Sequence, residues 1–118
     1  MISPILIAST DVDRRVVVMT ATGPMTAPAD VESLRTVMHA VPDGYGMIVD
    51  LSGVDELGDS SLATLCSIAD EAADAGIAMI VVCADGTHRT AMISAGVMSV
   101  APIVNAIEHA FPLTHHMA

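Results

Sequence analysis

One stretch of the sequence decides the fold: Met47-Ile48-Val49-Asp50-Leu51-Ser52-Gly53-Val54-Asp55-Glu56-Leu57-Gly58-Asp59-Ser60-Ser61. Residues 46–51 form a nearly continuous apolar run of strand length, which favours a strand buried on both faces. A polar loop is expected next, because its two glycines permit turns of the backbone. Asp59 is the expected N-cap of the following helix, so that Ser60 and Ser61 occupy the first helical turn. The stretch therefore predicts a strand, a loop and a helix whose N-terminus carries two hydroxyl groups.

The rest of the chain shows alternating strand and helix patterns. Two apolar segments separated by the turn-like Asp11-Val12-Asp13-Arg14 predict an antiparallel hairpin near the N-terminus. The expected strands cover residues 2–10, 16–21, 46–51 and 77–83, and the expected helices cover residues 26–41, 59–75, 87–95 and 102–110. Strands that alternate with helices of this length indicate an α/β fold with parallel strands. We therefore expect a mixed β-sheet of four to five strands, an N-terminal antiparallel hairpin plus parallel members, packed with about four helices.

Particular residues are expected to bound and orient these helices. Thr26 is the expected N-cap of the first helix, and Gly76 fits the left-handed position after the second. Leu62, Leu65, Cys66, Ala69, Ala72 and Ala73 recur at helical spacing and form the expected buried face of the second helix. Pro102 is acceptable in the first turn of a last helix that continues through Ile103 and Val104.

The composition is that of one intracellular domain. The chain has 118 residues, of which 53% are hydrophobic, and this length is enough to bury about two thirds of the unfolded surface. No apolar run approaches the roughly 18 residues that a membrane helix needs, and the N-terminus lacks the pattern of a signal peptide. We expect a single domain over residues 1–118, with residues 111–118 as a candidate flexible tail, in a cytoplasmic protein without membrane insertion.

The charged residues exclude several functions. The chain has four arginines, no lysine and fourteen acidic residues, which gives a formal net charge of -10. Binding to nucleic acid relies on clustered Lys and Arg, so no nucleic-acid partner is expected. A P-loop, a Schiff-base enzyme and a receiver domain each need a lysine that this chain lacks. The acidity fits either a solvated surface or a surface that attracts a basic partner.

A buried strand, an Asp-Ser-Ser helix start, a glycine after the helix and a second buried strand follow one another along the chain. They are formed by Ile48-Val49-Asp50-Leu51-Ser52-Gly53-Val54, Asp59-Ser60-Ser61, Gly76 and Met79-Ile80-Val81-Val82, with Ala95-Gly96-Val97 near the end. Together they resemble the STAS domain family, which includes the bacterial anti-sigma factor antagonists. The resemblance covers most of the chain.

The resemblance implies a regulatory binding module that catalyses nothing and uses no cofactor and no metal. In anti-sigma factor antagonists, a partner kinase phosphorylates the serine directly after the aspartate, which is Ser60 here, with Ser61 as the alternative. The implied partner is an anti-sigma factor with serine kinase activity, and the implied process is regulation of transcription. Phosphorylation would block binding to this partner. The expected partner-binding residues are Asp55, Glu56, Gly58, Asp59, Ser60, Ser61 and Leu62.

Three other interpretations of these residues stay open. Aspartate and serine are the usual residues at helix starts, and the cluster could do no more than cap the helix. The chain could also be a STAS subunit of a transport or stress-signalling assembly in which no phosphorylation occurs. In a third interpretation, the carboxylates bind Mg²⁺ in a small enzyme. Those carboxylates are Asp50, Asp55, Glu56 and Asp59.

Other reactive side chains are weaker candidates. Cys66 and Cys83 are expected to be core residues, with a redox disulfide between them as the alternative. His88 and Arg89, near the start of a helix, could help to hold a phosphate or a partner. The pair His115-His116 could bind a metal ion, although a frayed end of the chain is the simpler interpretation.

Overall fold

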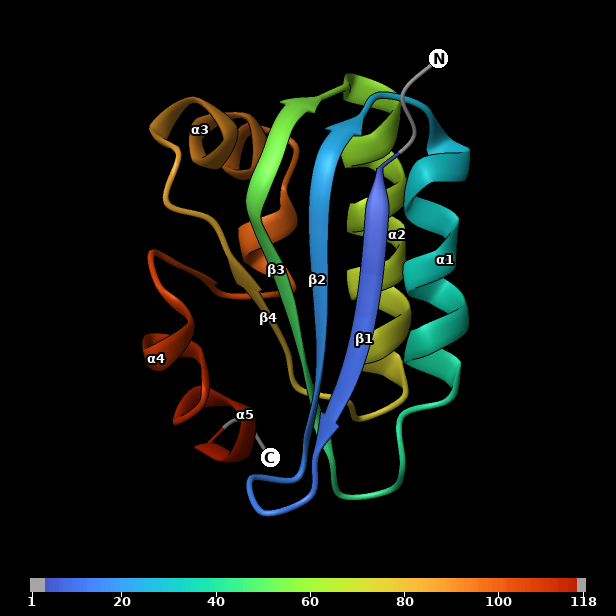
Figure 1. The fold of residues 1–118 in the computed structure, drawn as a ribbon, viewed down its shortest axis with the longest axis vertical. Helices are drawn as coiled ribbons and strands as arrows, with labels where there is room; N and C mark the ends of the chain where they lie inside the picture. Colours follow the sequence, from blue (N-terminus) through green and yellow to red (C-terminus); the bar gives the residue numbers. More distant parts are fainter. Residues whose placement is uncertain (1–3, 117–118) are drawn as a thin grey trace.

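The computed structural model describes the backbone of residues 4–116 and the side chains of residues 4–114. Its elements are β1 (Ile5–Asp11), β2 (Val16–Met25), α1 (Pro28–His39), β3 (Gly46–Leu57), α2 (Asp59–Asp74), β4 (Met79–Val82), α3 (Gly86–Ser94), a 3₁₀ helix (Val97–Ser99), β5 (Ile103–Val104), α4 (Ile107–Ala110) and α5 (Leu113–His116). The strands form one sheet in the order β1-β2-β3-β4-β5 (Figure 1). β1 and β2 are antiparallel and all other neighbours are parallel, which confirms the expected mixed α/β sheet.

Helices cover both faces of the sheet and create two apolar cores. On one face, Leu34 and Met38 of α1 are buried together with Leu65 and Ile68 of α2. On the other face, α4 and α5 lie over β3 and β4, and a smaller core contains Ile48 (Figure 1). Successive residues of a strand point to opposite faces, so the same central strands supply side chains to both cores.

β3 and β4 are interior strands, as their apolar runs predict. Met47, Ile48 and Val49 of β3 are fully buried, and every residue of β4 is buried as well. Where helices cover both faces of a strand, water reaches no side chain, so the side chains of that part of the strand are apolar.

β2 and β3 are longer than the sequence predicts, and the polar loop expected after residue 51 is wrong. After a shift of register between Thr20 and Thr22, their parallel pairing continues from Thr22 opposite Gly53 to Met25 opposite Leu57, with a second shift between Gly23 and Pro24. Most side chains in this extension of β3 are exposed, and its backbone is paired to β2. The polar residues of this segment therefore led to the prediction of a loop where the structure has a strand. Only Gly58 separates β3 from α2.

Both expected N-caps are displaced by one residue. The N-cap of α1 is Ala27 and not Thr26, and the Asp30 side chain bonds back to the residues that precede the helix. Its Oδ2 accepts hydrogen bonds from the backbone N–H groups of Thr26 at 3.1 Å and Ala27 at 3.0 Å. The N-cap of α2 is Gly58, because pairing with β2 keeps the chain extended up to this residue. Asp59 is therefore the first helical residue, at the positive end of the helix dipole.

The last expected helix, over residues 102–110, is largely wrong. Its first part is β5, which completes the sheet beside β4. The backbone N–H of Val81 donates to the carbonyl of Pro102, and that of Cys83 donates to the carbonyl of Val104, each at 2.9 Å. The buried edge of β4 needs these hydrogen bonds, and this tertiary requirement overrides the local helical pattern.

Part of the candidate flexible tail, residues 111–118, packs against the rest of the fold. Phe111 and Leu113 are half-buried and pack against the smaller core. α5 continues the backbone to residue 116. The side chains of His115 and His116, for which metal binding was considered, lie outside the described residues, as does the rest of the tail.

The buried face of α2 mostly follows the predicted spacing. The buried residues are Ser61, Leu62, Leu65, Ile68, Ala69 and Ala72. The prediction is wrong for Ala73, which is exposed, and Cys66 is only half-buried. Gly76 adopts a φ of 75° after the last turn, as predicted. The N–H of Ile77 then donates to the carbonyl of Ala72 at 2.8 Å and closes the helix end.

Substitution of Leu65 tests this packing. Leu65 is 2% exposed, so Leu65→Ala should lower the free energy of unfolding, by about 2–5 kcal/mol as for other buried leucines. Urea denaturation followed by circular dichroism measures the change. Ile93→Ala removes an exposed side chain of α3 and serves as the control; it should cost less than about 1 kcal/mol. A loss below about 0.5 kcal/mol for Leu65→Ala would contradict the assigned face.

Candidate functional site

The two serines lie where β3 ends and α2 begins (Figure 1). In open α/β sheets, ligands bind outside the carboxyl ends of the strands, which is where this junction lies. The backbone N–H of Gly58 donates to the carbonyl of Met25 at 2.9 Å. A Cβ atom on Gly58 would lie 2.8 Å from the carbonyl oxygen of Thr26, closer than real Cβ atoms approach. Glycine therefore allows the start of α2 to lie directly against the end of β2.

Ser60 and Ser61 differ completely in exposure. Ser60 is exposed, and its Oγ donates a long hydrogen bond of 3.3 Å to the carbonyl of Thr26. Ser61 is 0% exposed, and its Oγ donates to the carbonyl of Ala27 at 3.0 Å. Successive residues of a helix point about 100° apart, so one hydroxyl faces solvent and the next faces the start of α1. Of the two serines, only Ser60 presents its hydroxyl to the outside.

The surroundings of Ser60 combine a helix N-terminus with carboxylates. Ser60 is the second residue of α2, where backbone N–H groups lack acceptors within the helix and carry partial positive charge. Asp59 precedes it, and Asp55 and Glu56 lie near the end of β3; all three side chains are exposed. The backbone at this position favours an anion, and the surrounding surface is acidic.

The expected partner-binding residues fall into two groups. Asp55, Glu56, Asp59 and Ser60 are exposed, and Gly58 is half-buried. Ser61 and Leu62 are 0% and 3% exposed, so their side chains belong to the core. The first group lies in the stretch of chain where β3 ends and α2 begins, with Asp55 and Glu56 directed to opposite faces of the strand, and the second group belongs to the core.

A groove beside this stretch was not found from the sequence. Its volume is about 390 Å³, and its walls are formed by Asp59, Leu62 and Ala63 of α2, by Ala91 and Ser94 of α3, and by Ala95 directly after α3. The small side chains on the facing parts of the two helices leave this space open. Ala91 and Ala95, one helical turn apart, were the available signal in the sequence, but the sequence did not reveal that α2 and α3 lie beside each other.

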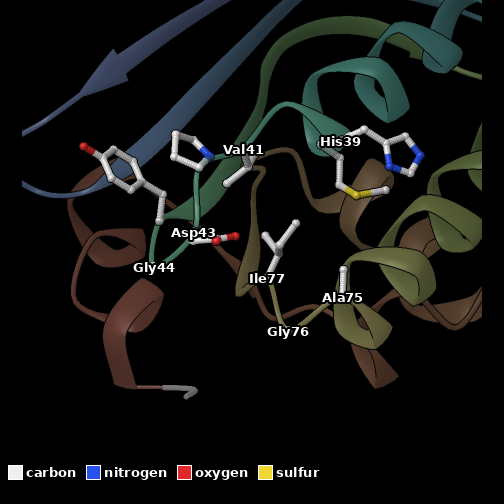
Figure 2. Close-up of a pocket in the computed structure, with 10 residues that line it drawn as sticks. His39, Val41, Asp43, Gly44, Ala75, Gly76 and Ile77 are labelled. Atoms are coloured by element: carbon white, nitrogen blue, oxygen red, sulfur yellow. The ribbon is translucent and has the colours of Figure 1, made fainter.

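A second pocket, of about 240 Å³, lies near the other end of β3 (Figure 2). It is formed where α1 and α2 end, and Figure 2 shows Val41, Ala75 and Ile77 among its lining residues. Asp43 and His39 are the polar side chains labelled there, and both are exposed. The pocket has no connection with the serines, which lie at the opposite end of β3 and α2.

The carboxylates considered as Mg²⁺ ligands do not form a metal site. The Oδ1 of Asp50 accepts a hydrogen bond from the backbone N–H of Ser52 at 3.0 Å, which is a local contact. Within the part of the chain that the structure describes, no three His, Cys, Asp or Glu side chains are grouped in a way that could hold a metal ion. The Mg²⁺ hypothesis therefore gains no support from the geometry.

His88 and Arg89 are the third and fourth residues of α3 and lie in its first turn. Asp85 is the N-cap of this helix, and its Oδ1 accepts from the backbone N–H of His88 at 3.0 Å. This hydrogen bond lowers the pKa of the Asp85 carboxyl. The Nδ1 of His88 is buried and has no hydrogen-bond partner among the described residues. The arrangement explains how α3 begins, and it does not connect these residues to Ser60.

The sequence model of the STAS domain matches residues 8–110. No curated protein matches this chain. Among residues 4–116, no helix combines the length and the apolar character that crossing a membrane requires.

Several solved structures are similar in fold. The anti-sigma factor antagonist from Mycobacterium paratuberculosis has a TM-score of 0.74 at 19% identity, over 95% of this chain and 94% of that one. The anti-sigma factor antagonist SpoIIAA in its unphosphorylated form has a TM-score of 0.65 at 16% identity, over 92% of this chain and 96% of that one. Bacillus SpoIIAA in its phosphorylated form has a TM-score of 0.63 at 14% identity, over 90% and 96%. These similarities show a shared fold.

Gly58→Ala tests the close contact at the start of α2. The added Cβ would meet the backbone of Thr26, which cannot move aside cheaply. We expect the free energy of unfolding to fall by about 1–3 kcal/mol. Gly86→Ala is the matched control, because a Cβ there meets nothing within 4 Å; it should change stability by less than about 1 kcal/mol. Equal effects of the two substitutions in thermal and urea denaturation would contradict the assigned contact.

The reactivity of the cysteines tests their burial. Both are free thiols, and Cys83 is buried whereas Cys66 is half-buried. Burial raises the pKa of the Cys83 thiol, which disfavours the reactive thiolate. In single-cysteine chains carrying Cys66→Ala or Cys83→Ala, a chromogenic disulfide reagent should label native Cys83 at least about tenfold more slowly than native Cys66. In denaturant the rates should converge. Rapid labelling of native Cys83 would instead favour a redox role.

Proposed function

Because the chain belongs to the STAS domain family, we propose that it acts as an anti-sigma factor antagonist controlled by phosphorylation of Ser60. The unmodified protein binds an anti-sigma factor with serine kinase activity in the bacterial cytoplasm, and this binding releases a sigma factor for transcription. The protein itself catalyses no reaction. The similar structures from Mycobacterium paratuberculosis and Bacillus support this function, since they are described as anti-sigma factor antagonists and SpoIIAA occurs in a phosphorylated form.

The exposure of Ser60 beside a buried Ser61 is the observation that carries the proposal. A kinase has to bring the hydroxyl to its γ-phosphate, and the Ser60 hydroxyl is held only by a 3.3 Å hydrogen bond to the carbonyl of Thr26. The Ser61 hydroxyl is buried and bonded to the carbonyl of Ala27 at 3.0 Å. Modification of Ser61 would require the start of α2 to separate from α1, and this supports the assignment of the phosphate to Ser60.

The phosphate acts on the interface and leaves the core unchanged. It adds nearly two negative charges at the N-terminus of α2, where free backbone N–H groups and the helix dipole stabilise an anion. The same charges stand beside the exposed carboxylates of Asp55, Glu56 and Asp59. A partner that fits the neutral hydroxyl of Ser60 loses that fit when the phosphate occupies the contact.

The partner contacts the exposed stretch Asp55, Glu56, Gly58, Asp59 and Ser60, with Ser61 and Leu62 supporting it from the core. Its carboxylates favour a partner with basic groups around the contact. The groove between α2 and α3 begins at Asp59, so a partner side chain could enter it while the partner contacts Ser60. The protein could instead bind a transporter or a signalling scaffold without being phosphorylated. That result would support the alternative, a STAS subunit of a transport or stress-signalling assembly.

Ser60→Ala and Ser60→Asp test the switch. With the cognate anti-sigma factor and ATP, Ser60→Ala should abolish phosphate incorporation and leave binding within about twofold, because the helix start keeps its backbone contacts. Ser60→Asp should keep the fold but weaken binding by at least about tenfold, which is about 1.4 kcal/mol. Mass spectrometry locates the phosphate, and calorimetry measures the binding.

Two controls separate the switch from changes in fold and in total charge. Ser61→Ala removes a buried hydrogen bond and should lower stability by about 0.5–1.5 kcal/mol while Ser60 is still phosphorylated. Ser33→Asp adds the same charge on an exposed residue of α1 and should leave binding unchanged. If the kinase modifies Ser60→Ala as readily as the original chain, or if Ser60→Asp binds the partner with full affinity, Ser60 is only part of a helix start.

A further inference from the structure

The pocket of about 240 Å³ where α1 and α2 end, called the helix-end pocket below, receives the negative ends of two helix dipoles. His39 is the last residue of α1 and Ala75 directly follows α2, and both line the pocket (Figure 2). The carbonyl groups of a last helical turn point along the axis beyond the end of the helix and carry partial negative charge. Two such ends at one pocket make it attractive to a cation.

Carboxylates add to this negative potential. Asp43 lines the helix-end pocket, and Asp74 is the last residue of α2. A basic side chain is favourable near a helix C-terminus, but the last turn of α2 contains none. Among the described residues, neither Asp43 nor Asp74 takes part in an ion pair. Both carboxylates are exposed, so they act on whatever enters the pocket.

The basic side chains of α1 are directed to other carboxylates. Arg35 forms ion pairs with Glu32 and Glu71, the second through its Nε at 2.7 Å. The Nε2 of His39 lies 3.9 Å from the other carboxylate oxygen of Glu71. α2 contains no basic residue at all. The two helices therefore supply no arginine or lysine that would neutralise the helix-end pocket.

The walls of the pocket are largely apolar. Met38 is buried, and Val41 and Ile77 are half-buried. Figure 2 shows Val41 and Ile77 beside Asp43, so an apolar surface adjoins the carboxylate. Tyr45 also lines the pocket, and the face of an aromatic ring attracts cations. The pocket thus combines negative potential with a surface that suits an alkyl chain.

We propose that the helix-end pocket binds a small organic cation, an ammonium or guanidinium group on a short alkyl chain. The charged head lies at the helix ends beside Asp43, and the alkyl chain packs on Val41 and Ile77. The net charge of -10 attracts cations to the whole molecule and repels anions. The volume is below the roughly 300–1,000 Å³ of pockets for drug-sized ligands, which limits the ligand to a few heavy atoms. A free amine and a basic side chain of a protein partner share this chemistry.

NMR titration with n-butylammonium and with N-acetylarginine amide tests the site. We expect saturable shifts of the backbone amides of Gly44 and Gly76, which line the pocket, with a Kd of about 0.1–10 mM that NaCl weakens. Tighter binding of the first probe favours a free amine as the ligand, and tighter binding of the second favours a partner's side chain. n-Butyrate, which has a similar chain and the opposite charge, should cause no such shifts. Absence of saturation with both cations, or equal binding of n-butyrate, overturns the proposal.

Three variants separate the pocket from general attraction to an acidic protein. Asp43→Asn should weaken binding of both cations by at least about threefold, because it removes the charge nearest the ligand. Glu108→Gln removes an exposed carboxylate of α4, outside the pocket lining, and should change the Kd by less than about 1.5-fold. Ala75→Leu fills the pocket without a change of charge and should weaken binding at least about fivefold, with an unchanged circular dichroism spectrum. Equal effects of Asp43→Asn and Glu108→Gln, or full binding by Ala75→Leu, contradict the assigned site.

Discussion

The pairing of β2 with β3 continues to the last residue of each strand, and the position of α2 depends on it. Met25 lies opposite Leu57, and the N–H of Gly58 donates to the carbonyl of Met25 at 2.9 Å. The chain is therefore extended up to Gly58 and helical from Asp59. This abrupt change fixes the rotation of α2 about its axis, and the rotation decides which of the next two hydroxyls faces water.

Hydrogen bonds also connect α2 with α1 and with the two residues just before α1. The two serine hydroxyls donate to the carbonyls of Thr26 and Ala27, just before α1. Farther along, Arg35 of α1 donates to the carboxylate of Glu71 at 2.7 Å and to the hydroxyl of Ser67 at 3.2 Å. α2 is thus hydrogen-bonded to α1 and to the residues just before it, both at its N-terminus and farther along the helix.

The surface at the proposed interface has a definite chemistry. Ser60 lies at a helix N-terminus with the exposed carboxylate of Asp59 before it, and one added phosphate there would change the local field strongly.

By itself, the sequence determined what depends on neighbours along the chain. The apolar runs around Ile48 and Ile80 predicted interior strands, because a strand covered on both faces needs apolar residues throughout. The spacing of Leu62 and Leu65 predicted the buried face of α2, and Gly76 marked its end, because helix periodicity and left-handed backbone are local properties. The position of Ser60 in the first turn of that helix followed from the same local reasoning.

Tertiary structure decided what depends on segments far apart in the sequence. The polar end of β3 is a strand because β2 supplies its hydrogen bonds, and Ile103 and Val104 form β5 because β4 needs a partner. Ser61 is buried because α1 lies beside the start of α2, and no pattern within the Asp-Ser-Ser segment distinguishes it from Ser60. Hydrogen-bond partners and burial come from the packing of distant elements, so the resemblance pointed to Ser60 with Ser61 as the alternative, and only the fold shows that Ser60 is exposed and Ser61 buried.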